Sequence, residues 1–87
     1  MELLSYRNEL DVIDAQIVHL FEERLEICDK IAEYKRLNNL PILDEKREHD
    51  KLLAIENMVE DERNESLTVE LFEKIMELSK IRQEKSK

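Results

Sequence analysis

Apolar residues recur along the first 37 positions of the chain with alternating steps of three and four residues. They are Leu3, Tyr6, Leu10, Ile13, Ile17, Leu20, Ile27, Ile31 and Tyr34. Such steps bring side chains onto one face of an α-helix. Neither glycine nor proline interrupts this stretch. The pattern therefore predicts one uninterrupted helix from about residue 3 to residue 37.

Two shorter helices are predicted after this one. The run Asn38-Asn39-Leu40-Pro41 ends the first helix, because asparagine tolerates a left-handed cap and proline cannot continue a helix. Asp44 is a typical N-cap for a second helix over about 45–59. A polar connection over residues 60–65 precedes a third helix over about 67–85. The expected fold is all-α, with one long and two shorter helices in a single domain over residues 1–87.

The length of the first helix indicates a dimer. At 1.5 Å per residue it is roughly 50 Å long, whereas a compact chain of this size has a diameter of only about 30 Å. The two shorter helices cannot cover an apolar face of that length. We therefore expect an intertwined helical homodimer, and no segment is left over for a fused second domain.

Composition and charge narrow the possible partners. Glycine is absent and 41 % of residues are charged, a mix that is typical of helical proteins with solvated outer faces. The net charge of −8 disfavours binding to nucleic acid or to an anionic membrane. Cys28 is the only cysteine and fits a reduced thiol. Since neither a signal peptide nor a membrane span is evident, a cytoplasmic location is expected.

Each predicted helix carries polar residues on a face that should be inward. Arg24 interrupts the apolar ladder of the first helix, and Cys28, Ile31 and Lys35 follow it at helical spacing. The second helix has the line Glu48, Leu52, Ile55 and Val59. The third has one line of Leu71, Ile75 and Leu78, and an adjoining line of Phe72, Met76, Ser79 and Gln83. Buried cations are costly unless an anion pairs with them, so the pattern indicates a site for a small polyanion.

Simpler explanations exist for each of these residues taken singly. A lone polar residue in a helical seam often fixes register or oligomeric state. A lysine can lay its stem along the core and keep its ammonium group in water. His19 and His49 are isolated and read as surface residues, so no metal site is expected. These explanations would have to apply to three helices independently, whereas one ligand site accounts for all three.

The residues in this order resemble the all-helical class of chorismate mutases over essentially the whole chain. The resemblance is carried by the segments YRNELDVID, EERLEICDKIAEYK, PILDEKRE and LFEKIMELSKIRQ. Its most specific part is the D-x-x-R-E run of Asp44, Arg47 and Glu48 at its distance from Lys35.

The resemblance implies a dimer with paired first helices and two active sites, each built from both chains. Arg7 fits this arrangement, because it lies 17 residues, or roughly 25 Å along a helix, from Arg24. One small molecule cannot reach both on the same helix, but antiparallel helices would bring Arg7 of one chain toward Arg24 of the other.

The reaction that the resemblance implies is the Claisen rearrangement of chorismate to prephenate in phenylalanine and tyrosine biosynthesis. It takes place within one molecule and needs no cofactor or metal. Arg24 and Arg7 of the partner subunit would hold the carboxylates, and Lys35 and Gln83 would approach the ether oxygen. Further contacts are implied for Asp44, Arg47, Glu48 and Ser79, with Glu48 accepting from the ring hydroxyl.

Two other functions remain open from the sequence. An isochorismate-pyruvate lyase could use the same scaffold and a similar cationic site. A non-catalytic dimerisation module would instead predict that Arg24→Leu and Lys35→Leu raise stability and leave function intact.

Overall fold

A computed structural model describes residues 2–85 and confirms an all-helical chain. The elements are α1 (Glu2–Leu37), α2 (Glu45–Met58), the short 3₁₀ helix η1 (Glu62–Asn64) and α3 (Glu65–Lys85). No strand occurs within these residues. The predicted bounds of the three helices agree with these to within two residues.

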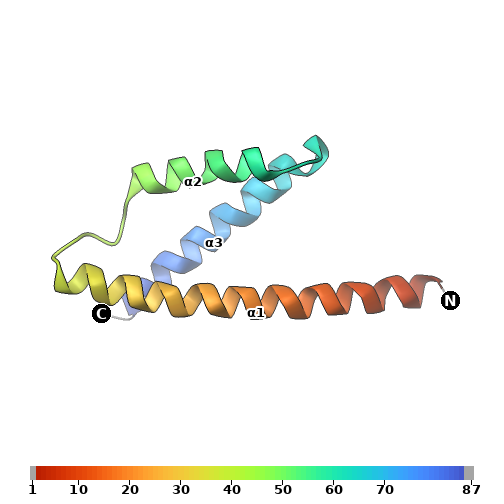
Figure 1. Ribbon diagram of the computed structural model, residues 1–87, viewed down its shortest axis with the longest axis horizontal. Coiled ribbons are helices and arrows are strands. Elements are labelled where there is room, and N and C mark those ends of the chain that lie inside the picture. Colours follow the sequence, from red (N-terminus) through yellow and green to blue (C-terminus); the bar gives the residue numbers. More distant parts are fainter. Residues whose placement is uncertain (1, 86–87) are drawn as a thin grey trace.

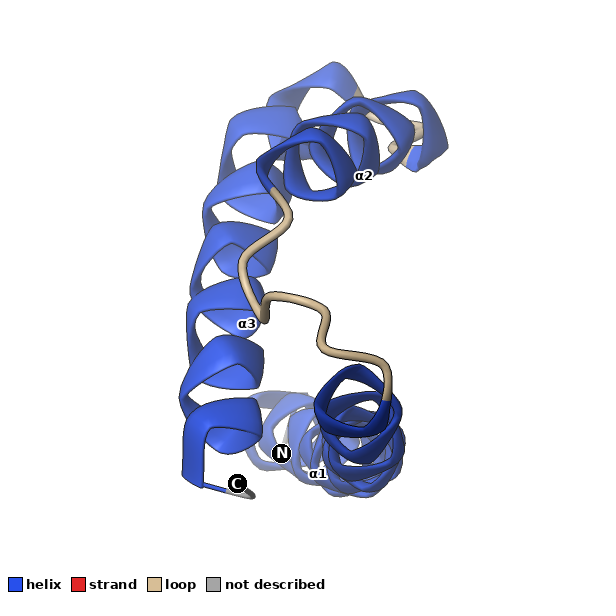
Figure 2. Cartoon of the chain, turned by 90° about the vertical axis from the view of Figure 1, so that its left-hand side faces the viewer, coloured by secondary structure: helices blue, strands red, loops and turns tan. Residues whose placement is uncertain are grey.

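The three helices form an open arrangement in which α3 joins the other two. In Figure 1, α2 lies above α1, and α3 runs diagonally from the end of α2 back to the carboxyl-terminal half of α1. The end view in Figure 2 has the outline of a letter C, with α3 as its back. Within residues 2–85, α3 contacts both α1 and α2, whereas α1 and α2 do not contact each other. The position of α2 relative to α1 therefore depends on α3.

The ends of the first two helices follow the predicted local chemistry. Asn39 has a φ of 53°, the left-handed conformation expected after α1. The backbone amide of Leu40 donates to the carbonyl of Lys35 at 2.8 Å and so satisfies one of the last carbonyls of α1. Asp44 is the N-cap of α2, because its Oδ1 accepts a hydrogen bond from the backbone amide of Arg47 at 3.0 Å.

The connection between α2 and α3 contains more structure than a polar loop. Asp61 caps η1 through the backbone amide of Arg63 at 3.0 Å, and the two side chains pair at 2.7 Å. Hydrogen bonds from the Arg63 side chain, and then from its backbone, lower the pKa of the Asp61 carboxyl. η1 runs directly into α3, so the helical path begins earlier than the predicted residue 67. This turn cannot be predicted from the sequence, because an aspartate in an acidic run resembles an ordinary solvated residue.

Little of a single chain is buried. The buried apolar residues are Cys28, Ala32 and Ile55, and among the described residues none of the large side chains is fully buried. On α3 the line of Phe72, Met76, Ser79 and Gln83 is the inward one, while Leu71 and Leu78 are exposed. The sequence could not tell which of these two lines faces inward.

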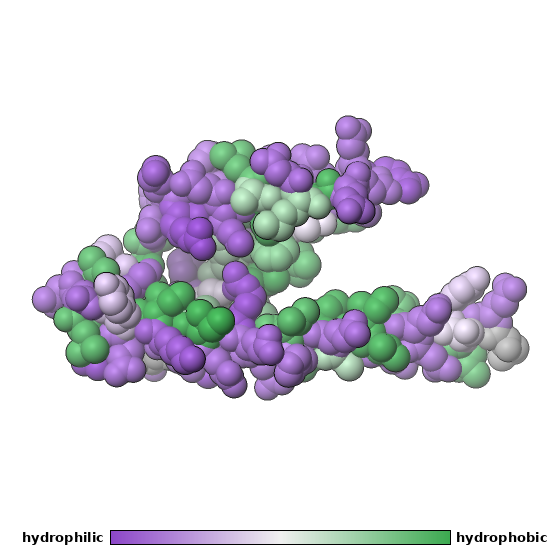
Figure 3. All heavy atoms as spheres, in the orientation of Figure 1, coloured by the Kyte–Doolittle hydropathy of each residue, from purple (hydrophilic) through white to green (hydrophobic). Residues whose placement is uncertain are grey.

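The apolar ladder of α1 is exposed along its whole length in the single chain. Every one of its nine residues, from Leu3 to Tyr34, keeps at least 40 % of its surface accessible. Figure 3 shows this apolar surface along α1, including the part that projects beyond α2 and α3. The chain extends over 56 × 25 × 15 Å. As expected, the shorter helices do not cover α1. None of the helices between residues 2 and 85 combines the length and apolarity that crossing a bilayer requires.

Candidate active site

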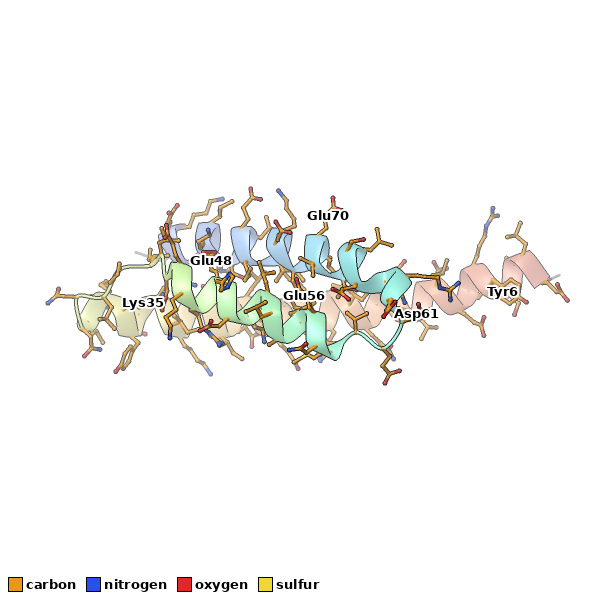
Figure 4. The ribbon with its side chains drawn as sticks, turned by 90° about the horizontal axis from the view of Figure 1, so that it is seen from above. Tyr6, Lys35, Glu48, Glu56, Asp61 and Glu70 are labelled. Carbon is orange, nitrogen blue, oxygen red and sulfur yellow. The ribbon has the colours of Figure 1, made fainter. Side chains whose placement is uncertain are left out.

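A pocket of about 350 Å³ lies where α3 meets the carboxyl-terminal part of α1 and the start of α2. Seven of the eight predicted site residues line it: Arg24, Lys35, Asp44, Arg47, Glu48, Ser79 and Gln83. They come from three helices and one loop. The structure therefore brings together residues up to 59 positions apart in the sequence, as the helical spacing suggested. Figure 4 shows Lys35 and Glu48 near the same end of the elongated molecule.

The α1 wall of the pocket is one face of the helix. Arg24, Cys28, Ile31 and Lys35 follow each other at steps of four, three and four residues and all line the pocket. Cys28 is buried at 5 % exposure and Ile31 is more open. The wall thus begins and ends with a cation and is apolar between them, which suits a ligand with a hydrocarbon body and charged groups at its ends.

Hydrogen bonds fix the two cations of this wall. Arg24 donates from Nη1 to the Ser79 hydroxyl at 3.1 Å, and that hydroxyl donates to the Ile75 carbonyl at 2.8 Å. Lys35 donates from Nζ to the Ile42 carbonyl at 2.7 Å, which ties the loop after α1 to the helix. Both acceptors are neutral. The two positive charges are therefore held in place without being neutralised.

Cations outnumber carboxylates around the pocket. Five cationic side chains line it, against the carboxylates of Asp44 and Glu48. Glu48 pairs with Lys80 at 2.9 Å. Among residues 2–85, the other four cations have no carboxylate within ion-pair distance: Arg24, Lys35, Arg47 and Lys51. A chain with a net charge of −8 thus concentrates uncompensated positive charge in one pocket, which favours an anionic ligand.

Two pocket residues, Lys51 and Lys80, are not among the predicted site residues. Both line the pocket. A signal was present in the helical spacing, because Lys51 follows Arg47 by one turn and Lys80 lies between Met76 and Gln83 at steps of four and three. Lysines are so frequent on solvated helix faces that the signal was not distinctive.

Gln83 is the least satisfied of the pocket residues. Its side chain is 7 % exposed, and its Oε1 has no hydrogen-bond partner within the described part of the chain. A buried amide oxygen without a partner costs about 1–3 kcal/mol. A buried unsatisfied group in a native fold calls for an explanation, and the amide that carries this oxygen belongs to a residue of the pocket wall.

A bidentate ion pair braces α3 against α1 next to the pocket. Arg82 donates from Nε and Nη2 to the two carboxylate oxygens of Asp29 at 2.8 and 2.9 Å. These hydrogen bonds, followed by the charge of Asp29, raise the pKa of the Arg82 guanidinium. Arg82 precedes Gln83 and Asp29 follows Cys28, so the pair fixes the two helices beside the pocket wall.

Arg7 is the one predicted site residue that does not line the pocket. Figure 4 shows the neighbouring Tyr6 at the opposite end of α1 from Lys35. A contribution of Arg7 to this pocket would therefore have to come from a second chain. His19 and His49 are exposed, and no group of metal-ligating side chains occurs within residues 2–85.

Replacing Gln83 by leucine should raise the free energy of unfolding by about 1 kcal/mol, because it removes a buried acceptor without a partner. Ser79→Ala is the matched control, since Ser79 is equally buried at 8 % but has both its hydrogen bonds. It should lower the free energy of unfolding. Urea denaturation at one fixed protein concentration measures both. A loss of stability in Gln83→Leu as large as that in Ser79→Ala would contradict the assignment of Gln83 as unsatisfied.

Comparisons with known proteins relate the chain as a whole to one family. A family model described as chorismate mutase type II matches residues 6–84. A bifunctional chorismate mutase/prephenate dehydratase of Buchnera aphidicola subsp. Schizaphis graminum is 38 % identical over 85 residues, which are 97 % of this chain and 22 % of that protein. The structure of a conserved hypothetical protein from Pyrococcus furiosus aligns with a TM-score of 0.77 and 41 % identity, over 95 % of this chain and 96 % of the other. The chain belongs to the chorismate mutase type II family, a family of isomerases.

Proposed function

We propose that this chain is a chorismate mutase that converts chorismate to prephenate, with the pocket between α1, α2 and α3 as its active site. The observation that carries the proposal is the group of four cations that have no carboxylate partner among residues 2–85, in a pocket of about 350 Å³, found in a chain of this family. Chorismate is a small dianion with an apolar ring, and it matches both the charge of the pocket and its apolar wall.

The reaction needs positioning and charge stabilisation rather than a nucleophile. One carbon–oxygen bond breaks while one carbon–carbon bond forms in the same molecule. An enzyme accelerates such a step by holding the compact, chair-like conformer and by stabilising the charge that develops on the ether oxygen. Fixed cations and amide groups suit this task, because they do not have to reorganise during the reaction.

The roles of the residues follow from their chemistry and position. Arg24, which Ser79 orients, binds a substrate carboxylate through its guanidinium group. Lys35 binds a carboxylate and approaches the ether oxygen, and the Gln83 amide donates to that oxygen from the α3 side. Glu48 accepts a hydrogen bond from the ring hydroxyl.

Asp44, Arg47 and Ser79 complete the site. Asp44 caps α2 and so places the backbone at the start of that helix beside Glu48. The Arg47 side chain adds a further cation for a carboxylate, and Ser79 contributes its hydroxyl near the ring. This assignment uses every predicted residue that lines the pocket.

The proposed active form is a homodimer with paired α1 helices. Its main support is the exposed apolar ladder of α1, since burying one large apolar side chain contributes about 1.5–3 kcal/mol. Antiparallel pairing of α1 brings Arg7 of the partner subunit toward Arg24. The site then has a second arginine that binds a substrate carboxylate. A closed dimer of this kind is symmetric and contains two such sites.

The purified protein should consume chorismate and form prephenate, and Arg24→Ala should lower kcat/KM by about 100-fold or more, because a charge-assisted contact to the reacting anion is lost. Arg36→Ala is the matched control, since Arg36 is an exposed arginine on the same helix that does not line this pocket. It should keep wild-type activity. Product analysis with chorismate and with isochorismate in parallel measures the outcome.

Turnover of isochorismate to salicylate and pyruvate, without prephenate formation from chorismate, would show that the protein is a lyase and not a mutase. A folded dimer that converts neither substrate would favour the non-catalytic module.

Mixing two inactive variants should restore activity if each site uses both chains. Arg7→Ala and Arg24→Ala subunits, unfolded together and refolded at equal amounts, give roughly half heterodimers, each with one intact and one doubly defective site. Activity should therefore return to roughly a quarter of the wild-type value. Chorismate consumption before and after co-refolding measures it. No recovery in a mixture shown to contain heterodimers would mean that Arg7 and Arg24 do not share a site across the dimer.

A further inference from the structure

Lys80 lines the pocket but has no role in the mechanism proposed above. It lies on α3 directly after Ser79 and three residues before Gln83. Its Nζ is 2.9 Å from Oε1 of Glu48 on α2, and the two side chains are 36 % and 25 % exposed. The pair therefore joins two helices at the pocket wall, in a partly buried position where an ion pair is screened less than on the open surface.

Glu48 has several cations from which its partner could come. The charged groups that line the pocket with it are Arg24 and Lys35 from α1, Asp44 from the loop, Arg47 and Lys51 from α2, and Lys80 from α3. Within the described residues, Lys80 is the only cationic side chain whose nitrogen lies within 4.0 Å of a Glu48 carboxylate oxygen. Lys80 thus selects one orientation of a flexible side chain among several that the surrounding charges would allow.

The pair leaves one carboxylate oxygen available. The closest contact of the pair joins Nζ of Lys80 to Oε1 of Glu48, and among residues 2–85 no hydrogen bond goes to Oε2 and no other cation pairs with Glu48. A glutamate side chain has three rotatable bonds, and ordering it costs conformational entropy. Because Lys80 already orders Glu48 before the substrate binds, the second carboxylate oxygen can accept a hydrogen bond with little further loss of conformational entropy.

We propose that Lys80 is a positioning residue, which holds Oε1 of Glu48 so that Oε2 faces the ring hydroxyl of the substrate. This inference rests on the proposed function, since it concerns the same pocket and the same substrate. It assigns Lys80 an effect that passes through Glu48 and not through the substrate carboxylates. Two other roles for Lys80 make different predictions. As a direct ligand of a carboxylate, it would act whether or not Glu48 is present. As a brace between α2 and α3, it would affect stability and leave catalysis unchanged.

A double-mutant cycle on kcat/KM for chorismate separates these roles. Lys80→Met keeps the length and apolar stem of the side chain and removes its charge. It should lower kcat/KM about tenfold, because an oriented, charge-assisted hydrogen bond to the hydroxyl is lost. The same substitution in a Glu48→Gln background should cause no further fall. Lys80→Arg keeps a cation at the pocket and should restore most of the activity.

The cycle includes a control and a check on folding. Lys74→Met is the matched control, because Lys74 is an exposed lysine of α3 that pairs with Glu77 of its own helix. It should leave kcat/KM unchanged. Circular dichroism and the urea midpoint of each variant show whether the fold is retained.

An equal fall in kcat/KM in both backgrounds would overturn the proposal in favour of direct substrate binding. Unchanged kcat/KM in Lys80→Met, with or without a lower urea midpoint, would overturn it in favour of the brace. Either result with an active wild type would leave the proposed function standing. A wild-type protein that does not convert chorismate would overturn both.

Discussion

The central physical feature of this structure is positive charge that the protein places in a pocket and does not neutralise. Arg24 is held by a hydroxyl and Lys35 by a backbone carbonyl, so each is oriented by a neutral group. The energetic cost of collecting such charges is recovered only when an anion binds. Oε1 of Gln83, which has no partner among residues 2–85, adds a second cost at the same place. The uncompensated cations are unfavourable for stability alone and are explained by the binding of an anionic ligand.

This pocket exists because α3 contacts both of the other helices, while α1 and α2 do not contact each other within residues 2–85. Two polar contacts of α3 lie at the pocket, Ser79 with Arg24 and Lys80 with Glu48, and a third, Arg82 with Asp29, lies beside it. The contacts of Ser79 and Arg82 join α3 to α1, and the contact of Lys80 joins α3 to α2. The same helix thus supplies pocket residues and fixes the walls opposite them. The rest of α1, with its exposed apolar ladder, extends beyond this unit.

The sequence was sufficient for features that depend on local spacing and insufficient for those that depend on packing. The three helices and the Asp44 cap follow from periodicity and from short-range hydrogen bonding. Arg24, Lys35, Glu48, Ser79 and Gln83 could be predicted because each interrupts or extends an apolar line. Asp44 and Arg47 were predicted as site residues from the family resemblance, through the D-x-x-R-E run. Lys80 could not be predicted, since a lysine on a chain with 41 % charged residues resembles any solvated cation until its distance to Glu48 is known. The inward line of α3 could not be chosen either, because both lines have helical spacing and only packing against α1 and α2 distinguishes them.

The most direct measurement of the central claim is the binding of a stable bicyclic dicarboxylate that contains an ether oxygen and mimics the chair-like transition state. Isothermal titration calorimetry should give one molecule bound per chain, with an affinity at least about 100-fold higher than that of the substrate. Binding should weaken with increasing salt concentration, because the contacts are between charges. Failure of the folded protein to bind this compound, or binding that Arg24→Ala and Gln83→Leu both leave unchanged, would contradict the account.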